Sequence, residues 1–213
     1  MRTNPFYDAW LFVIGSTDSH ENLDEFKYVF VALFLVLLAG SFWIAWLNWR
    51  ADRTQRTAAH VTTWISRLLI GCMWFQGSLW KLPLPVSDGF EHWTGQMGEH
   101  AAFAIHRAVV KAVYLPHLDV IGPLVFLAEI SFAISFMLGA GVRFFALLAV
   151  PYCLHLWLGL YQHPGEWPWN YIFLTLVHVW FVLDAAGRSL GADALLRARW
   201  WTGWGGRIVS VLS

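Results

Sequence analysis

Five apolar stretches, each close to the length needed to cross a lipid bilayer, run along this sequence. A helix needs about 20 mostly apolar residues to cross about 30 Å of hydrocarbon. Within the stretches, apolar and polar residues do not alternate, which excludes the strands of a membrane β-barrel. The stretches are Tyr28–Trp49, Val61–Leu82, Val120–Ala140, Val142–Gln162 and Trp169–Ala186. The pattern predicts an all-α polytopic membrane helix bundle with five spans.

Two further segments have the pattern of helices that lie in the membrane interface. Residues Gly98–Leu115 are too charged to span, but Phe103, Val110 and Val113 fall near one helical face. This segment is predicted to lie in the interface plane between the second and third spans. Residues 197–213 mix Arg with Trp and are predicted to form an interfacial tail.

Composition and charge support a membrane protein and exclude one class of partner. The chain is 58% hydrophobic and only 13% charged, whereas a soluble domain carries about 25% charged residues. Aromatic side chains concentrate at membrane interfaces, and the chain has 15 Trp and 16 Phe. The net charge is zero and no basic block is present, so nucleic acid is not an expected partner.

The basic residues predict the orientation of the chain, because Lys and Arg favour the cytoplasmic side. With five spans, the loops on one side hold nine of the 14 basic residues and those on the other side hold five. The nine are Arg50, Arg53, Arg56, Arg67, Arg143, Arg188, Arg197, Arg199 and Arg207. The N-terminus is therefore expected outside and the C-terminus in the cytoplasm.

Several polar residues fall inside the predicted spans, where a charged side chain costs several kcal/mol. Glu129 lies near the middle of the third span and His178 at a similar depth in the fifth. His155 and Gln76 fall in the outer halves of the fourth and second spans, and Lys81 ends the second. Such residues either join helices by hydrogen bonds or handle protons beside a lipid-soluble ligand. The sequence leaves both interpretations open.

Two histidines on different spans also raise the alternative of b-type haem, whose iron takes one imidazole from each side. His155 and His178 would be its ligands, although they differ in depth by about one helical turn. The two cysteines, Cys72 and Cys153, form no CxxC pattern, which favours buried thiols over a metal site or c-type haem.

Three segments resemble the DoxX/DoxD family of small bacterial and archaeal membrane proteins. They are "RLLIGCMWFQGSLWKL" from Arg67, "EISFAISFMLGAGVRF" from Glu129 and "AGRSLGADALL" from Ala186. The resemblance implies a four-helix DoxX-like membrane bundle over residues 61–196. It leaves residues 1–60 as an N-terminal extension that carries the first transmembrane helix.

The best-known member of this family is the DoxD subunit of thiosulfate:quinone oxidoreductase. The resemblance therefore implies a membrane subunit of a quinone-linked oxidoreductase in the bacterial or archaeal inner membrane, with a quinone and proton site in the outer half of the bundle. Its partners would be other membrane or extracytoplasmic subunits, together with lipid and quinone. Because no redox cofactor is evident in the sequence, whether this chain is itself an enzyme stays open.

The expected roles divide the polar residues into three groups. Proton transfer is expected from Glu129, His155 and His178. Contact with the quinone is expected from Gln76, Lys81 and Trp157. Binding of the thiosulfate dianion is expected from Lys81, Arg107, Lys111 and His163. Two alternatives remain: a non-catalytic subunit that anchors a larger respiratory or photosynthetic complex, and a carrier of b-type haem or another small ligand.

Overall fold

The computed structural model describes residues 4–200, and in this part of the chain all regular structure is helical. The α-helices are α1 Pro5–Val13, α2 Lys27–Ala51, α3 Ala58–Leu79, α4 Asp88–His100, α5 Ala104–Val109, α6 Leu118–Leu138, α7 Val142–Gly159, α8 Trp169–Asp184 and α9 Ala192–Trp200. Short 3₁₀ and π turns join them: η1 Asp18–Phe26, η2 Arg53–Gln55, η3 Val110–Tyr114, η4 Leu115–His117 and η5 Ala186–Arg188. The all-α prediction is confirmed for these residues.

Three helical segments are long and apolar enough to cross a membrane: Pro5–Ala51, Ala104–Leu138 and Val142–Gly159. They contain α2, α6 and α7. Helix α8 is apolar but has only 16 residues. Helix α3 has 22 residues, but Arg67 and Gln76 make it more polar. The chain therefore has the features of an integral membrane protein with three clear candidate spans.

All five predicted apolar stretches are helices, and local chemistry sets several of their ends. Thr57 precedes α3 and its side chain accepts a hydrogen bond from the His60 N–H at 3.3 Å, as an N-cap does. Gly139 ends α6 in the left-handed conformation, with φ of 72°, and Gly141 begins α7 with φ of 63°. Glycine is the residue that adopts this conformation at least cost.

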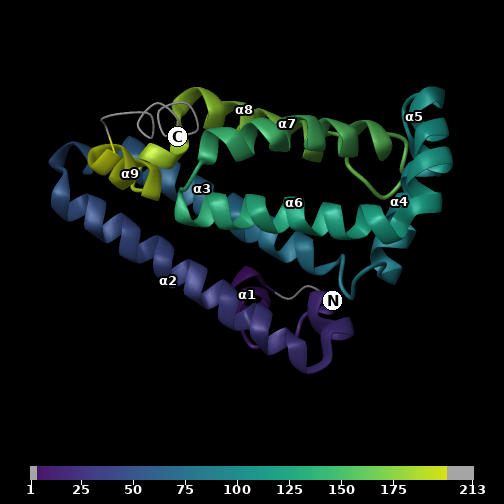
Figure 1. Ribbon diagram of the computed structural model, residues 1–213, viewed down its shortest axis with the longest axis horizontal. Coiled ribbons are helices and arrows are strands. Elements are labelled where there is room, and N and C mark those ends of the chain that lie inside the picture. The colour runs from purple at the N-terminus through teal and green to yellow at the C-terminus, as the bar shows by residue number, and fades with distance from the viewer. Residues whose placement is uncertain (1–3, 201–213) are drawn as a thin grey trace.

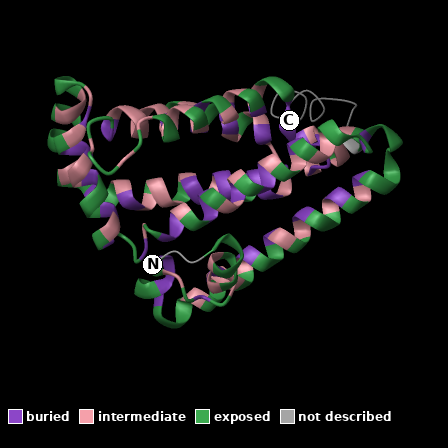
Figure 2. Cartoon of the chain, turned by 180° about the vertical axis from the view of Figure 1, so that it is seen from behind, coloured by how far each residue is buried: buried purple, intermediate pink, exposed green. Residues whose placement is uncertain are grey.

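The bundle consists of two antiparallel helix pairs. Helix α3 packs along α6, and α7 packs along α8. In Figure 1 the two pairs meet near α9, and α4 and α5 lie across the opposite end. We call these the α9 end and the α4 end. Helix α2 packs on the α3–α6 pair and exposes most of its surface (Figure 2).

The α9 end is held together by a fully buried arginine, Arg67 of α3. Its guanidinium group donates hydrogen bonds to the Phe136 carbonyl at 2.7 Å and to the Ser189 carbonyl at 3.4 Å. A methyl group at Gly139 would collide with this guanidinium group and with the backbone of Gly191. The absence of side chains at both glycines therefore lets three segments approach the arginine.

Asp193 of α9 is the second polar group at this end. Its carboxylate accepts hydrogen bonds from the backbone N–H groups of Gly141 at 2.7 Å and Val142 at 3.2 Å, where α7 begins. Burial raises the pKa of the Asp193 carboxyl group, and these hydrogen bonds and the charge of Arg67 oppose that shift. A carboxylate at a helix N-terminus also stabilises the helix dipole. Asp193 thus fixes α9 against α7.

The segment between α3 and α6 differs from the prediction of one interfacial helix over Gly98–Leu115. Helix α4 occupies its beginning, and α5 with η3 and η4 leads into α6. The chain is extended at Ala101, because the His100 carbonyl accepts a hydrogen bond from Gln162 and the Ala102 N–H donates one to Leu158. These hydrogen bonds, to Leu158 of α7 and to Gln162 just after that helix, take the place of hydrogen bonds within a helix.

The N-terminal segment folds back onto α2 and α3. The Phe12 ring of α1 lies 5.0 Å from the Phe34 ring and 6.4 Å from the Phe75 ring, measured between centroids. Residues 4–60 therefore pack on the bundle in part through aromatic contacts. Of the predicted interfacial tail at 197–213, residues 201–213 lie outside the described part of the chain.

Candidate functional site

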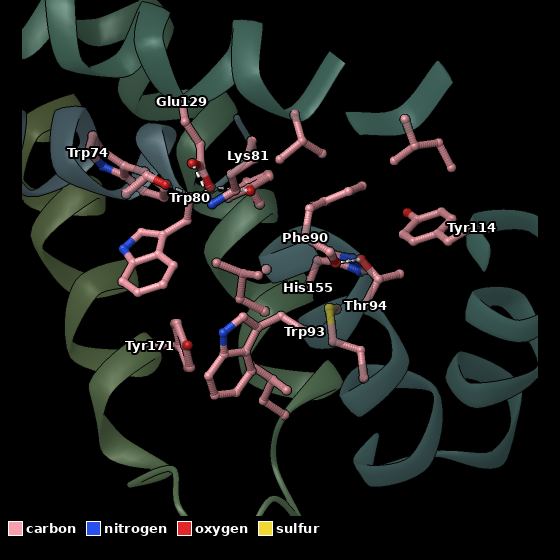
Figure 3. Close-up of a pocket in the computed structure, with 18 of the residues that line it drawn as sticks. Trp74, Trp80, Lys81, Phe90, Trp93, Thr94, Tyr114, Glu129, His155 and Tyr171 are labelled. Carbon is pink, nitrogen blue, oxygen red and sulfur yellow. Dashed lines mark hydrogen bonds and ion pairs between the residues drawn. The ribbon is translucent and has the colours of Figure 1, made fainter. Parts of the chain in front are cut away.

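A cavity of about 440 Å³ lies between the two helix pairs, toward the α4 end (Figure 3). It is lined by side chains from α3, α4, α6, α7 and α8 and by Tyr114 of η3. Small-molecule sites measure about 300–1,000 Å³ and are mostly apolar with a few placed polar groups. Helix α3 and the turn that follows it contribute one stripe, with the spacing of residues on one helical face: Met73, Trp74, Gly77, Trp80 and Lys81.

An ion pair and a tyrosine form the polar centre of this cavity. Nζ of Lys81 lies 2.7 Å from Oε2 of Glu129, and the two side chains are 17% and 3% exposed. The Tyr152 hydroxyl group donates a 2.6 Å hydrogen bond to Oε1 of Glu129. Lys81 also donates to the Gly77 carbonyl at 3.0 Å. The structure therefore brings together Glu129 and Lys81, which the sequence predicted as site residues on different helices.

This centre can donate hydrogen bonds to a ligand. An ammonium group has three donors, and Lys81 donates one hydrogen bond to the Gly77 carbonyl, while its contact with Oε2 of Glu129 is an ion pair without hydrogen-bond geometry. Glu129 is buried, and the attraction of Lys81 and the hydrogen bond of Tyr152 offset the cost of burying its charge. The arrangement suits a polar head group that enters an otherwise apolar cavity.

Aromatic side chains close the cavity on the side of the α9 end. Trp74 donates its indole N–H to Nε2 of His178 at 3.0 Å. Nδ1 of His178 lies 2.7 Å from the Leu174 carbonyl, which can only accept, so Nδ1 carries the proton. Both ring nitrogens are thus occupied, and His178 does not line the cavity. Its evident role is to hold the Trp74 ring.

His155 lines the cavity and belongs to a pair of histidines. Its Nδ1 lies 3.0 Å from Nε2 of His106 on α5, so one ring donates a hydrogen bond to the other. The Tyr114 ring lies 5.2 Å from the His155 ring. His106 is half-buried. The pair therefore links the cavity to α5 at the α4 end.

Helix α4 forms a wall of the cavity that the sequence analysis did not predict. Its lining residues follow helical spacing: Phe90, Trp93, Thr94 and Met97. The helix begins after Ser87, whose Oγ accepts from the Phe90 N–H and donates to the Trp80 carbonyl at 2.7 Å. A serine followed by Asp88 and Glu91 is a helix-start signal that could have located α4.

Three tyrosines of the lining, Tyr114, Tyr152 and Tyr171, and a carboxylate were also missed. Tyr152 stands three residues before His155, so the predicted site residue and the tyrosine share one face of α7. That spacing was the available signal. Glu166 lies in the loop between α7 and α8, lines the cavity and interacts with the Tyr171 hydroxyl group. No periodicity in the sequence indicates a loop residue of this kind.

The remaining predicted site residues do not line the cavity. Gln76 is exposed on α3, and Trp157 is half-buried on α7. Arg107 is half-buried on α5, and Lys111 forms an exposed ion pair at 2.7 Å with Glu99, which lowers the pKa of that carboxyl group. His163 contacts the rings of Trp93 and His100. Of the residues expected to bind thiosulfate, only Lys81 reaches the cavity.

Neither a metal site among the described residues nor a similar known protein is found for this chain. Residues 4–200 contain no group of three His, Cys, Asp or Glu side chains placed to hold a metal ion. Cys72 and Cys153 are both free. Comparison of the chain with protein-family models, curated proteins and solved structures finds no match.

Proposed function

We propose that the cavity binds a quinone and that the chain is the membrane subunit of a quinone-linked oxidoreductase. The observation that carries this proposal is the Lys81–Glu129–Tyr152 centre inside a cavity with mostly apolar walls. A quinone is a flat apolar ring with two carbonyl acceptors. The aromatic walls suit the ring, and a donor of the Lys81 ammonium group suits a carbonyl, beside the Tyr152 hydroxyl group, whose own proton is donated to Glu129.

The same groups fit the proton requirement of quinone reduction. Reduction of one quinone to a quinol consumes two electrons and two protons, and both protons end on the former carbonyl oxygens. Glu129 and Tyr152 are placed to pass a proton along their 2.6 Å hydrogen bond. His155 and His106 offer a second proton route from α5. The electrons would come from a partner subunit.

The thiosulfate part of the proposal rests on the resemblance to the DoxX/DoxD family. In that case an extracytoplasmic partner would carry the site that oxidises thiosulfate. Four of the residues on which the resemblance stands, Arg67, Gly139, Gly187 and Asp193, lie together at the α9 end. This clustering supports treating them as one structural motif of the bundle.

We also propose that α3 and α8 cross the membrane beside α2, α6 and α7, which makes five spans. Each lies along a clear candidate span, α3 along α6 and α8 along α7. The basic residues would then place the α9 end at the cytoplasmic face and the α4 end outside. The cavity would open in the outer half of a bacterial or archaeal inner membrane.

Quinone binding tests the proposal directly. Three tryptophans line the cavity, so a bound quinone should quench part of the intrinsic fluorescence: Trp74, Trp80 and Trp93. In the purified protein, Glu129→Gln should weaken binding of a decyl benzoquinone by about tenfold, because the carboxylate that holds the Lys81 ammonium group and the Tyr152 hydroxyl group beside the head group is lost.

Asp119→Asn is the matched control, since it makes the same chemical change at an exposed position of the same helix. It should leave the affinity unchanged. Equal affinities of the wild type and Glu129→Gln would remove this centre from quinone binding. A wild type that does not bind quinone at all would overturn the proposal in favour of an accessory role.

A further inference from the structure

The cavity has one edge that is exposed to the surroundings of the bundle. Met73 and Trp80 line the cavity on α3, yet they are 39% and 44% exposed. On the other edge of the same stripe, Trp74 is 3% exposed and the Lys81 side chain 17%. The stripe is therefore closed toward α6, which carries Glu129, and open on the Met73 and Trp80 side.

Helix α8 lies on the other side of this edge, and α3 does not pack along it. Leu174 and Tyr171 of α8 line the opposite side of the cavity. The two helices are bridged by the hydrogen bond between Trp74 and His178, toward the α9 end. Beyond that bridge, toward the α4 end, the cavity separates α3 from α8, and residues of both helices line it.

The length of this opening can be compared with the bilayer. Met73 and Trp80 are two helical turns apart, which corresponds to about 10 Å along α3 at a rise of 1.5 Å per residue. Trp80 is at the end of α3 and Met73 is further inside. If α3 spans about 30 Å of hydrocarbon, the opening covers about one third of that depth, where lipid chains surround the protein.

We infer that the ligand of this cavity is a long-tailed, membrane-dissolved quinone whose hydrocarbon tail leaves between α3 and α8, over Met73 and Trp80. This inference rests on the proposed function, because it takes the head group to be a quinone at Lys81, Glu129 and Tyr152. A cavity of about 440 Å³ is small for a ligand with a long tail, so the tail needs an exit. A flexible methionine at that exit adapts to a mobile chain.

The variant that tests the exit is Met73→Trp, which fills it with a larger side chain. Leu69→Trp is the control: Leu69 is 63% exposed one turn away on α3 and does not line the cavity. The ligands are a decyl benzoquinone and its tailless methyl analogue with the same head group. Affinities are measured by competition with a radiolabelled quinone, on the full chain in lipid nanodiscs.

Met73→Trp should weaken binding of the decyl quinone by about tenfold, because about two tail methylenes lose their contacts. The tailless analogue should change by less than about twofold, since its head group does not use the exit. Leu69→Trp should change neither affinity. An equal loss for both ligands, or no loss for the decyl quinone, would overturn the inference while leaving the proposed function intact. A wild type that binds neither ligand would overturn the proposed function itself.

Discussion

Tyr152 and Glu129 are joined by a 2.6 Å hydrogen bond that crosses from one helix pair to the other. Glu129 belongs to the α3–α6 pair, with its ion-pair partner Lys81 at the end of α3, and Tyr152 belongs to the α7–α8 pair. The polar centre of the cavity is thus also a contact between the two halves of the bundle. A ligand that competes with Glu129 for the Tyr152 hydroxyl group would therefore also weaken a contact between the two helix pairs.

Tyr152→Phe should lower quinone affinity by a few-fold to about tenfold, because the variant removes one hydrogen bond to or beside a charged group, worth about 0.5–1.5 kcal/mol or somewhat more. Tyr161→Phe is the control, since Tyr161 is exposed and absent from the cavity lining. Fluorescence titration measures both. Identical titration curves for the wild type and Tyr152→Phe would show that this hydroxyl group does not contact the ligand.

Two ion pairs among the described residues, Lys81–Glu129 and Lys111–Glu99, are expected to contribute differently to stability. Lys81→Met leaves Glu129 buried without its cation, and removal of one partner of a buried pair costs about 3–5 kcal/mol. Lys111→Met breaks an exposed pair with Glu99, whose side chains are 51% and 65% exposed, and should not change the midpoint of thermal unfolding. Thermal unfolding in mild detergent measures both variants. If Lys111→Met proved as destabilising as Lys81→Met, burial would not be the cause.

Gly139→Ala should destabilise the bundle by about 2–4 kcal/mol, because it combines a left-handed backbone with crowding of the Arg67 guanidinium group. Gly95→Ala in α4 is the matched control, since a methyl group there meets nothing within 4 Å. It should be neutral or stabilising by up to about 1 kcal/mol. The same unfolding measurement applies, and a Gly139→Ala protein as stable as the wild type would contradict the close packing at the α9 end.

The purified protein should show no haem b band in a reduced-minus-oxidised spectrum. A haem iron needs a free imidazole nitrogen, and His178 uses Nε2 for Trp74 and Nδ1 for Leu174. His155 also uses Nδ1 for His106. A haem b spectrum that disappears in His178→Gln would show that the hydrogen bonds of His178 give way to iron.

The helices themselves could be read from the sequence because length and apolarity are properties of consecutive residues. The stretch predicted at Tyr28–Trp49 is helix Lys27–Ala51, and that at Val120–Ala140 is helix Leu118–Leu138. Helix α4 was not predicted, because its few apolar residues are separated by polar residues and by glycines such as Gly89 and Gly95. Its start carries a local signal in Ser87, Asp88 and Glu91, but which face of α4 lines the cavity is set by tertiary packing.

The candidate site was only partly predictable for the same reason. Glu129 and Lys81 were recognisable because charged groups are rare in apolar segments. Tyr152 and Trp74 gave no such signal, because aromatic residues are common throughout this chain. Gln76 is on α3, five residues before Lys81, but its position around the helix axis directs it away from the cavity lining. The angular position of α3 relative to its neighbours decides this, and it is set by packing.

The buried Arg67 lies at one end of the bundle and the cavity lies toward the other. The two ends therefore differ in the substitutions that they tolerate. Arg67 and its glycines fix the distance between the helix pairs at the α9 end, where a single added methyl group collides with its surroundings. The α4 end also has close glycine contacts, of Gly159 with Met97 and of Gly122 with the Pro85 carbonyl, but Trp93 and Tyr114 line the cavity there with large side chains. Exchanging Trp93 or Tyr114 for a smaller or larger residue would change the shape of the cavity and leave the contacts of Arg67 at the α9 end unaltered. The same bundle can therefore accommodate head groups of different size.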